Sequence, residues 1–245
     1  MSQLPSGAGG YFYMKLAVMQ PYIFPYIGYF QLIKAVDKFV LYDDVNFINR
    51  GWINRNRILV NGTDSMFTIP LKDASQNKLI NEIDVNWDDN WKSKFLKTIE
   101  QSYKKAPFYE NVLPIIKKTI DVQEVQFSKI IENNLRLICD YLDIRTEIIS
   151  SSTIYQNTDK KAQERILDIC LQEKANHYIN PIGGLELYGK ELFAKENRQM
   201  NFIKSLPVEY KQFKNEFVPW LSVIDVLMFN STEEINKFLD NYELI

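Results

Sequence analysis

One stretch of the sequence brings carboxylates, guanidinium groups and an indole ring close together along the chain. Asp43 and Asp44 are followed by a block that contains Arg50, Trp52, Asn54, Arg55 and Arg57. Guanidinium groups grip phosphate through paired hydrogen bonds, and a carboxylate can act as a general base when burial raises its pKa. The stretch therefore predicts a site for a phosphate-bearing substrate. A surface ion pair is the alternative explanation of any single arginine.

A second candidate is a loop rich in proline and aromatic residues, which follows the apolar run 16–19. Prolines hold such a loop in one shape, and a glycine in it allows a close backbone approach. The candidate binding residues of this loop are Gln20, Tyr22, Tyr26, Gly28 and Tyr29. We expect the glutamine and Asn54 to orient a substrate, and Tyr22, Tyr29 and Trp52 to stack on its ring. The alternative is that the aromatic rings pack the loop onto the core.

Two later loops and a late aspartate complete the set of candidates. They supply Ser151, Ser152, Asn180, Gly183, Gly184, Tyr188 and Asp225. The serines precede a predicted helix, whose free N–H groups suit an anion, and paired glycines after a strand let a backbone approach a ligand. The aspartate adds a third candidate for a catalytic carboxylate beside Asp43 and Asp44. Helix capping and plain turns are the alternatives for this set.

Several common catalytic and binding motifs are missing from the sequence. His177 is the single histidine and has no cysteine or carboxylate neighbours at zinc-site spacing, so we expect a structural residue and no metal site. The G-x-S-x-G elbow of serine hydrolases is absent. Neither GxxxxGK[ST] nor GxGxxG occurs, so a P-loop nucleotidase and a dinucleotide site are not expected. The sequence indicates no particular cofactor.

The composition is that of a globular protein, with 46% hydrophobic and 24% charged residues in a chain of 245. A net charge of −2 gives no reason to expect nucleic acid as a partner. No apolar run reaches the roughly 20 residues of a membrane span. Cys139 and Cys170 lie in helix-like apolar patterns, which predicts buried free thiols and a cytoplasmic location. Residues 1–13 are rich in glycine and serine, and we expect a leader or an added extension there.

The periodicity of the chain predicts an α/β fold. Strands are expected at 15–19, 38–42, 57–60, 65–71, 82–85, 146–149, 177–179, 201–203 and 209–212, with Asn61-Gly62 as a hairpin turn. Helices are expected at 27–36, 159–172, 187–193, 222–229 and 232–242, with Ser222 and Thr232 as N-caps, and a helical stretch at 89–142. We expect a mostly parallel, Rossmann-like sheet with covering helices, a β-hairpin and a helical insertion. Its parts would be residues 14–88, a helical region 89–145, and residues 146–245, which complete the same domain.

Several unusual blocks, in this order, resemble the WbqC-like protein family. They are Gln20-Pro21-Tyr22 with 24–30, Tyr42-Asp43-Asp44-Val45, 51–58, Ser151-Ser152, Tyr178-Ile179-Asn180 with Gly183-Gly184 and Tyr188, and 217–225. The resemblance covers about 14–230 and departs at Asn180-Pro181, where a turn of the Ser/Asn-Gly kind is expected. It implies a bacterial protein of O-antigen, capsule or other surface-glycan biosynthesis.

A shorter segment is similar to nucleotidylyltransferase-type α/β proteins. Tyr26 and Tyr29 stand where those proteins carry the two histidines of H-x-G-H, after the first strand. The similarity implies a nucleotidylyltransferase-like sheet and nucleotide binding. The departure argues against nucleotidylyl transfer, because tyrosine brings no positive charge at neutral pH.

The leading hypothesis is a cytoplasmic transferase of surface-polysaccharide synthesis that attaches an acyl or aminoacyl group to a nucleotide-linked amino sugar. The expected partner is a small-molecule substrate of the nucleotide-sugar class. The group donor remains unnamed, and homo-oligomerisation stays open. Two alternatives remain: a non-catalytic sugar- or nucleotide-binding accessory protein of a glycan assembly complex, and a nucleotidylyltransferase or ATP-dependent ligase-like enzyme.

Overall fold

A six-stranded sheet forms the centre of the computed structural model, which describes residues 13–245. In spatial order its strands are β10 (Tyr242–Leu244), β9 (Gln199–Ser205), β8 (His177–Pro181), β1 (Lys15–Met19), β2 (Lys38–Leu41) and β7 (Glu147–Ile149). Neighbouring strands are parallel except β10, which pairs antiparallel with β9. The predicted α/β class with a mostly parallel sheet is thus confirmed.

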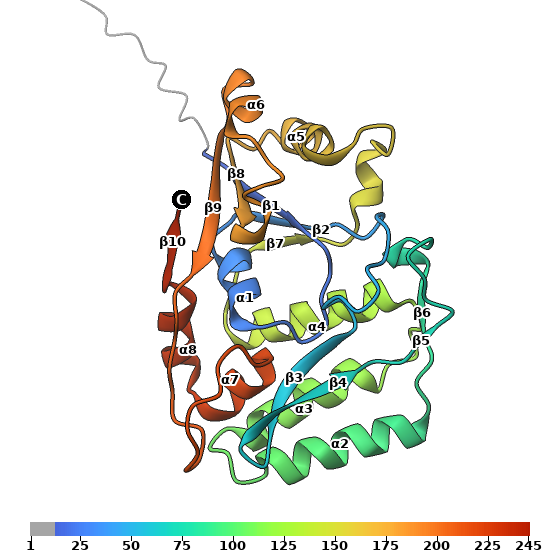
Figure 1. The fold of residues 1–245 in the computed structure, drawn as a ribbon, viewed down its shortest axis with the longest axis vertical. Helices are drawn as coiled ribbons and strands as arrows, with labels where there is room; N and C mark the ends of the chain where they lie inside the picture. The colour runs from blue at the N-terminus through green and yellow to red at the C-terminus, as the bar shows by residue number, and fades with distance from the viewer. Residues whose placement is uncertain (1–12) are drawn as a thin grey trace, which may run out of the picture.

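Alternation along the strands sends apolar side chains to both faces of the sheet, so both faces need a helical cover. Leu16 and Val18 of β1 pack in one cluster with α5 (Ala162–Gln172) and α6 (Lys190–Lys195). Ala17 packs in the other cluster with α1 (Ile27–Lys34) and α4 (Phe127–Tyr141). Figure 1 shows α5 and α6 on one side of the sheet and α1 and α4 on the other. The result is a three-layer arrangement.

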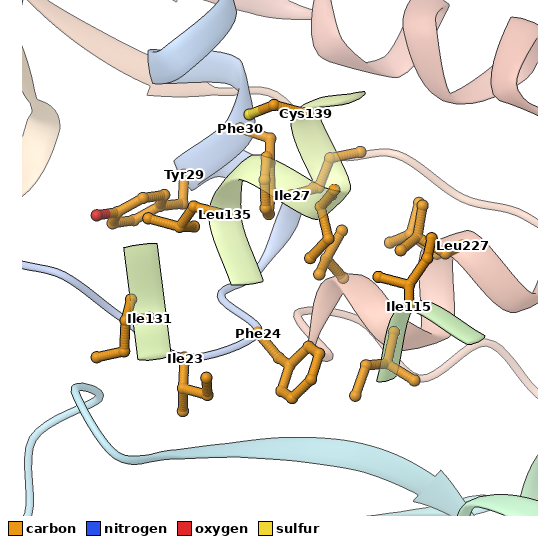
Figure 2. Packing of buried hydrophobic residues seen from close by; sticks show 14 of the residues in the cluster. Ile23, Phe24, Ile27, Tyr29, Phe30, Ile115, Ile131, Leu135, Cys139 and Leu227 are labelled. Atoms are coloured by element: carbon orange, nitrogen blue, oxygen red, sulfur yellow. The ribbon is translucent and has the colours of Figure 1, made fainter. Parts of the chain in front are cut away.

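The helical stretch expected at 89–142 folds as three helices. They are α2 (Asp89–Tyr103), α3 (Tyr109–Ile120) and α4. The last two helices of the chain, α7 (Val223–Phe229) and α8 (Thr232–Leu239), lie on the same side of the sheet. Figure 2 shows how this core joins distant segments, with Phe24 of the first loop, Ile115 of α3 and Leu227 of α7 packed together.

The predicted hairpin consists of β3 (Arg55–Val60) and β4 (Thr63–Thr68). Its turn residues Asn61 and Gly62 have φ of 53° and 80°, the positive values that a tight hairpin turn requires. A smaller antiparallel pair, β5 (Leu71–Lys72) and β6 (Asp84–Val85), follows it. Three short 3-10 turns complete the described elements: η1 (Ile80–Glu82), η2 (Ser152–Tyr155) and η3 (Ile182–Gly184).

Some of the predicted boundaries are wrong. Residues 209–212 form no strand, the last helix ends at Leu239 so that Tyr242 begins β10, and its N-cap is Ser231 rather than Thr232. Helix α5 begins at Ala162 instead of residue 159, and α6 runs Lys190–Lys195 instead of 187–193. Ser222 caps α7 as predicted, through a 3.2 Å bond from the Ile224 N–H.

Both cysteines are buried free thiols, as predicted. The leader or extension expected at 1–13 lies outside the described residues except for Tyr13. None of the helices described in residues 13–245 has the length and apolar character needed to cross a membrane.

Candidate functional site

Several of the candidate residues lie at the carboxyl-terminal edge of the parallel sheet. From β1 the chain continues to β2 on one side, whereas β8 later joins β1 on its other side. Open α/β sheets bind ligands at such a change of direction, beyond the carboxyl ends of the strands. Gln20 follows β1 there, Asp43 follows β2, Ser151 follows β7 and Asn180 lies at the end of β8.

Asp43 is held at this edge by the loop after β7. Its Oδ1 accepts a 2.6 Å bond from the Ser151 hydroxyl and a 3.3 Å bond from the Ser152 N–H. Burial raises the pKa of Asp43, and these hydrogen bonds act in the opposite direction. Asp43 is 2% exposed, and its Oδ2 accepts no bond from any other residue that the structure describes, so one oxygen of this carboxylate has no protein donor.

The neighbouring Asp44 is fully engaged in a buried ion pair. One of its oxygens accepts from the Ser152 hydroxyl and the other from the Arg165 guanidinium of α5. Asp44 and Arg165 are 6% and 5% exposed. The Arg165 guanidinium also donates a 2.9 Å bond from Nε to Asn157 and lies 4.9 Å from the centre of the Tyr42 ring. Asp44 therefore ties the end of β2 to α5.

Asp225 is buried in α7 with both oxygens occupied. Tyr103 donates to Oδ2 at 2.8 Å, and Tyr210 and Gln212 donate to Oδ1, each at 2.7 Å. Burial raises the pKa of Asp225, whereas these three bonds lower it. Its partners are side chains, so this carboxylate joins α2, α7 and the segment after β9 rather than capping a helix.

An arginine and several aromatic rings line a cavity of about 300 Å³ beside the first loop. Its lining residues are Tyr22, Pro25, Tyr26, Trp52, Asn56, Arg57 and Trp220. The two indoles are 44% and 50% exposed, so flat aromatic faces meet solvent here. The guanidinium carbons of Arg55 and Arg57 lie 5.8 and 5.9 Å from the centre of the Trp52 ring, which is cation–π distance.

Arg57 lines this cavity, and one of its guanidinium nitrogens has no acceptor among the described residues. Its Nη1 pairs with Asp64 at 3.0 Å and its Nη2 donates to the Trp220 carbonyl at 3.3 Å. Its buried Nε has no partner within residues 13–245. An unsatisfied guanidinium N–H beside aromatic faces suits an oxyanion that is attached to a ring.

Tyr26 and Trp220 form a wall that this cavity shares with two others. Their rings meet edge to face, with centres 6.2 Å apart. On one side lies an apolar pocket of about 230 Å³, lined by Ile27, Leu206, Pro207, Val208, Glu209, Tyr210, Phe217, Pro219, Leu221 and Val226 with the two rings. A smaller space of about 140 Å³ reaches Met19 at the end of β1 and Pro181 at the end of β8.

Gly28 is required where this wall meets the start of α1. A Cβ at this position would lie 2.3 Å from the Tyr26 ring and 2.4 Å from the Ser205 hydroxyl. Those distances are shorter than any normal contact, so only glycine fits without a shift. Burial raises the pKa of Tyr26, and a hydrogen bond with Ser205 lowers it.

Other predicted residues hold the loops rather than facing a cavity. Tyr29 is buried and donates a 2.8 Å bond to the Gln20 carbonyl, which ties the two ends of the first loop together. Asn54 donates to the Ile69 carbonyl at 2.9 Å, and Arg55 donates from Nε to the Gly51 carbonyl at 2.8 Å. Arg50 is exposed and is not part of the lining of this cavity.

The loop after β8 is also internally bonded. Asn180 accepts a 2.9 Å bond from the Tyr178 hydroxyl, and a Cβ on Gly184 would lie 1.9 Å from the Asn180 amide nitrogen. Tyr188 packs on Tyr178, with ring centres 6.4 Å apart. Gly183 is exposed. Gly184 therefore allows this loop to pack closely against Asn180 of its own strand, whereas Gly183 has no such role.

Three residues that matter here were not among the candidates. Trp220 lies in a block that resembles the family, and its position directly after a proline was the available signal. Asn56 is buried and donates to the Phe24 carbonyl at 2.9 Å, in alternation with Arg55 and Arg57 on β3. Arg165 stands in an apolar helical pattern, and nothing in its spacing distinguishes it from a surface arginine. Within the described part of the chain, three or more metal-ligating side chains do not cluster anywhere.

Comparisons with known proteins identify a relative of this chain and its family. The chain is similar to Uncharacterized protein Rv1507c of Mycobacterium tuberculosis, with 28% identity over 228 residues that cover 92% of this chain and 97% of that protein. No solved structure gives a significant match. A model of the WbqC-like protein family matches residues 20–237, most of the chain and all of the site described above. The chain belongs to the WbqC-like protein family.

Proposed function

We propose that this protein is a cytoplasmic transferase that attaches an acyl or aminoacyl group to a nucleotide-linked amino sugar. The observation that carries the proposal is the pair of unlike cavities on either side of Tyr26 and Trp220. In the first cavity, Arg57 would bind a phosphate and the two indole faces would stack on a ring. The second cavity is apolar and would hold the transferred group. Two substrates held on either side of one wall can react at its edge without diffusing apart.

Asp43 is the proposed general base. A base must accept a proton, and both oxygens of Asp44 and of Asp225 are already occupied by donors. Asp43 alone of the three keeps an oxygen without a protein donor, and its raised pKa makes it a better proton acceptor. In this proposal Asp43 removes a proton from the sugar amine as the amine nitrogen forms a bond to the carbonyl carbon of the donor. The bond from that carbon to the donor's leaving group then breaks, and the leaving group departs with the bonding electron pair.

The pathway is proposed from the family and not from the geometry. The resemblance associates such proteins with bacterial surface-polysaccharide synthesis, where sugars are modified while linked to nucleotides. A nucleotidylyl transfer is less well supported, because the Tyr29 hydroxyl is bonded to the Gln20 carbonyl instead of facing a ligand.

The proposal is tested by the mass of the sugar product. The protein is incubated with a panel of nucleotide-linked amino sugars and of acyl and aminoacyl donors, and mass spectrometry follows the gain of the transferred group. We expect Asp43→Asn to lower the rate by about 10²–10⁴-fold, the range for loss of a general base. Asp225→Asn is the matched control and should retain most of the rate per folded molecule. Full turnover of Asp43→Asn would end the base assignment. Binding without turnover for every donor would leave the accessory binding protein as the better account.

A further inference from the structure

We propose that the chain carries a second anion-binding site, for a ligand with closely spaced phosphate groups, in a groove at the turn of the β3–β4 hairpin. The groove has a volume of about 930 Å³, several times that of the arginine cavity. None of its lining residues lines the cavities around Tyr26 and Trp220. The inference is therefore independent of the proposed function.

Three segments that are distant in sequence build the groove. They are the hairpin turn Asn61-Gly62, the last turns of α2, and the loop 211–215. Helix α2 packs against β3, and Figure 1 shows the hairpin beside α2. The turn and the loop touch, because a Cβ on Gly62 would lie 2.9 Å from the Asn215 side chain. The walls are therefore held together by the fold.

The loop 211–215 is anchored, so its charged side chains stand on a fixed backbone. Buried Gln212 donates to Asp225 at 2.7 Å and to the Val218 carbonyl at 3.1 Å. Phe213 packs edge to face on Phe229, with ring centres 4.7 Å apart. It has a φ of 50°, a strained conformation that persists only when the surroundings hold it.

The lining is strongly positive in a chain whose net charge is −2. It contains five lysines and one glutamate: Lys97, Lys104, Lys105, Lys211, Lys214 and Glu100. Of the five, only Lys104 forms an ion pair within residues 13–245, at 3.2 Å from Glu100. Lys104 and Lys105 complement the dipole at the end of α2, but this explanation does not extend to Lys211 and Lys214 on the loop. Unpaired like charges facing one space repel each other, and an anion between them relieves that repulsion.

The chemistry of the lining points to phosphate. Lysine ammonium groups are compact point charges on flexible stems, and they bind phosphate without the planar geometry that arginine imposes. Ser102 lines the same groove, and its buried hydroxyl has no partner among the described residues, so its hydrogen-bonding capacity is unused. Because the cations are spread over a wide groove, two or more linked phosphate groups fit it better than a single one. Linked phosphates occur in soluble oligophosphates, and single phosphates lie close together on the surface of an anionic lipid membrane.

Titration calorimetry with inorganic tripolyphosphate and sedimentation with phosphatidylglycerol–phosphatidylcholine vesicles test the site. The groove variant is Lys97→Gln/Lys211→Gln/Lys214→Gln, which spares the two lysines at the helix end. The matched control is Lys72→Gln/Lys174→Gln/Lys195→Gln, which removes the same charge from exposed lysines outside the groove.

We expect wild type and control to bind one of the two probes and the groove variant to bind it at least tenfold more weakly. Raising the ionic strength should weaken wild-type binding, because screening acts on partly exposed charges. The probe that binds identifies the source of the phosphates. Equal losses in both triple variants, or binding of neither probe, would overturn the proposal.

Discussion

The three candidate aspartates differ in which of their oxygens remain available. Asp44 meets Arg165 and Ser152, and Asp225 meets two tyrosines and Gln212. Hydrogen bonds to both oxygens fix a carboxylate but leave it no direction in which to accept a substrate proton. Asp43 is different, since its two bonds share Oδ1. We therefore assign a structural role to Asp44 and Asp225 and propose a catalytic role for Asp43.

Replacing Asp225 by asparagine should destabilise the fold in a pH-dependent way. Asparagine cannot accept from all three donors, so the variant should lose about 1–3 kcal/mol, the cost of a buried donor left without an acceptor. The folded-state pKa of Asp225 is raised above 3.8, so its stabilising contribution is complete below 3.8 and is lost as pH rises through the folded value. Urea unfolding at several pH values should therefore show the largest difference between wild type and variant in acid.

Asp73→Asn, at an exposed position, is the control for this comparison. It should leave the free energy of unfolding within about 0.5 kcal/mol of wild type. A difference between wild type and Asp225→Asn that grows with pH would contradict the assigned direction of the shift.

The sequence singled out Asp43 and the arginine block as candidates but could not rank their members. Which carboxylate oxygen is occupied depends on partners from elsewhere in the chain. Ser151 lies 108 residues from Asp43, and Tyr210 lies outside the helix that carries Asp225. The pairing of Arg165 with Asp44 could not be predicted for the same reason, because only the folded chain brings the two residues together. Long-range partners of this kind leave no spacing signal.

The start of α1 is the element on which the shared wall depends. Gly28→Ala should displace the Tyr26 ring or the Ser205 side chain, since the new methyl group would lie 2.3 and 2.4 Å from them. We expect a loss of about 1–3 kcal/mol from overpacking and, with it, weaker ligand binding. Gly183→Ala is the matched control, because a Cβ there meets no atom within 4 Å. Thermal unfolding of both variants measures the difference in their stability. Equal stability of the two variants would show that the Tyr26 ring moves aside at no cost.

The ion pair between Asp44, after β2, and Arg165 of α5 should contribute strongly to the free energy of unfolding. Asp44→Ala leaves the Arg165 guanidinium buried without its partner, and we expect a loss of about 3–5 kcal/mol in denaturant unfolding. Glu233→Ala breaks the exposed pair with Lys237 and should cost about 0.5 kcal/mol or less. Similar effects of the two substitutions would mean that the Asp44 pair is hydrated and structurally unimportant.

Most of the main-sheet strands follow from apolar patterns, and the exceptions have tertiary causes. Residues 209–212 alternate like a strand, but Tyr210 and Gln212 turn to the Asp225 carboxylate instead of pairing with a neighbour. The residues of β10 were predicted as the end of a helix. They form a strand through antiparallel pairing with β9, which lies elsewhere in the sequence. Local propensity cannot register either interaction.

Two apolar clusters share the one central sheet, and each contains a cysteine. Cys139 of α4 belongs to one cluster and Cys170 of α5 to the other. Burial raises the pKa of both thiols to about 12, so neither should react with iodoacetamide in the folded protein at neutral pH. Because strands from both ends of the chain form the same sheet, we expect the two faces to unfold together.

Pulsed alkylation along a urea gradient, read by mass spectrometry of the two peptides, checks this expectation. Both thiols should become reactive with the same midpoint. Labelling of Cys170 at a clearly lower urea concentration than Cys139 would show that the C-terminal part unfolds separately.

The central claim is that the cavity of Arg57, Trp52 and Trp220 binds a nucleotide-linked sugar. Titration calorimetry of the whole chain against a panel of nucleotide-linked amino sugars tests it directly, with Arg57→Gln and Trp52→Ala as site variants. Arg145→Gln is the control, since this arginine is exposed and its ion-pair partner is Asp143. We predict that at least one sugar nucleotide binds and that both site variants weaken it at least tenfold while the control does not. Binding that is unchanged in Arg57→Gln and Trp52→Ala, or no binding by any member of the panel, would contradict the claim.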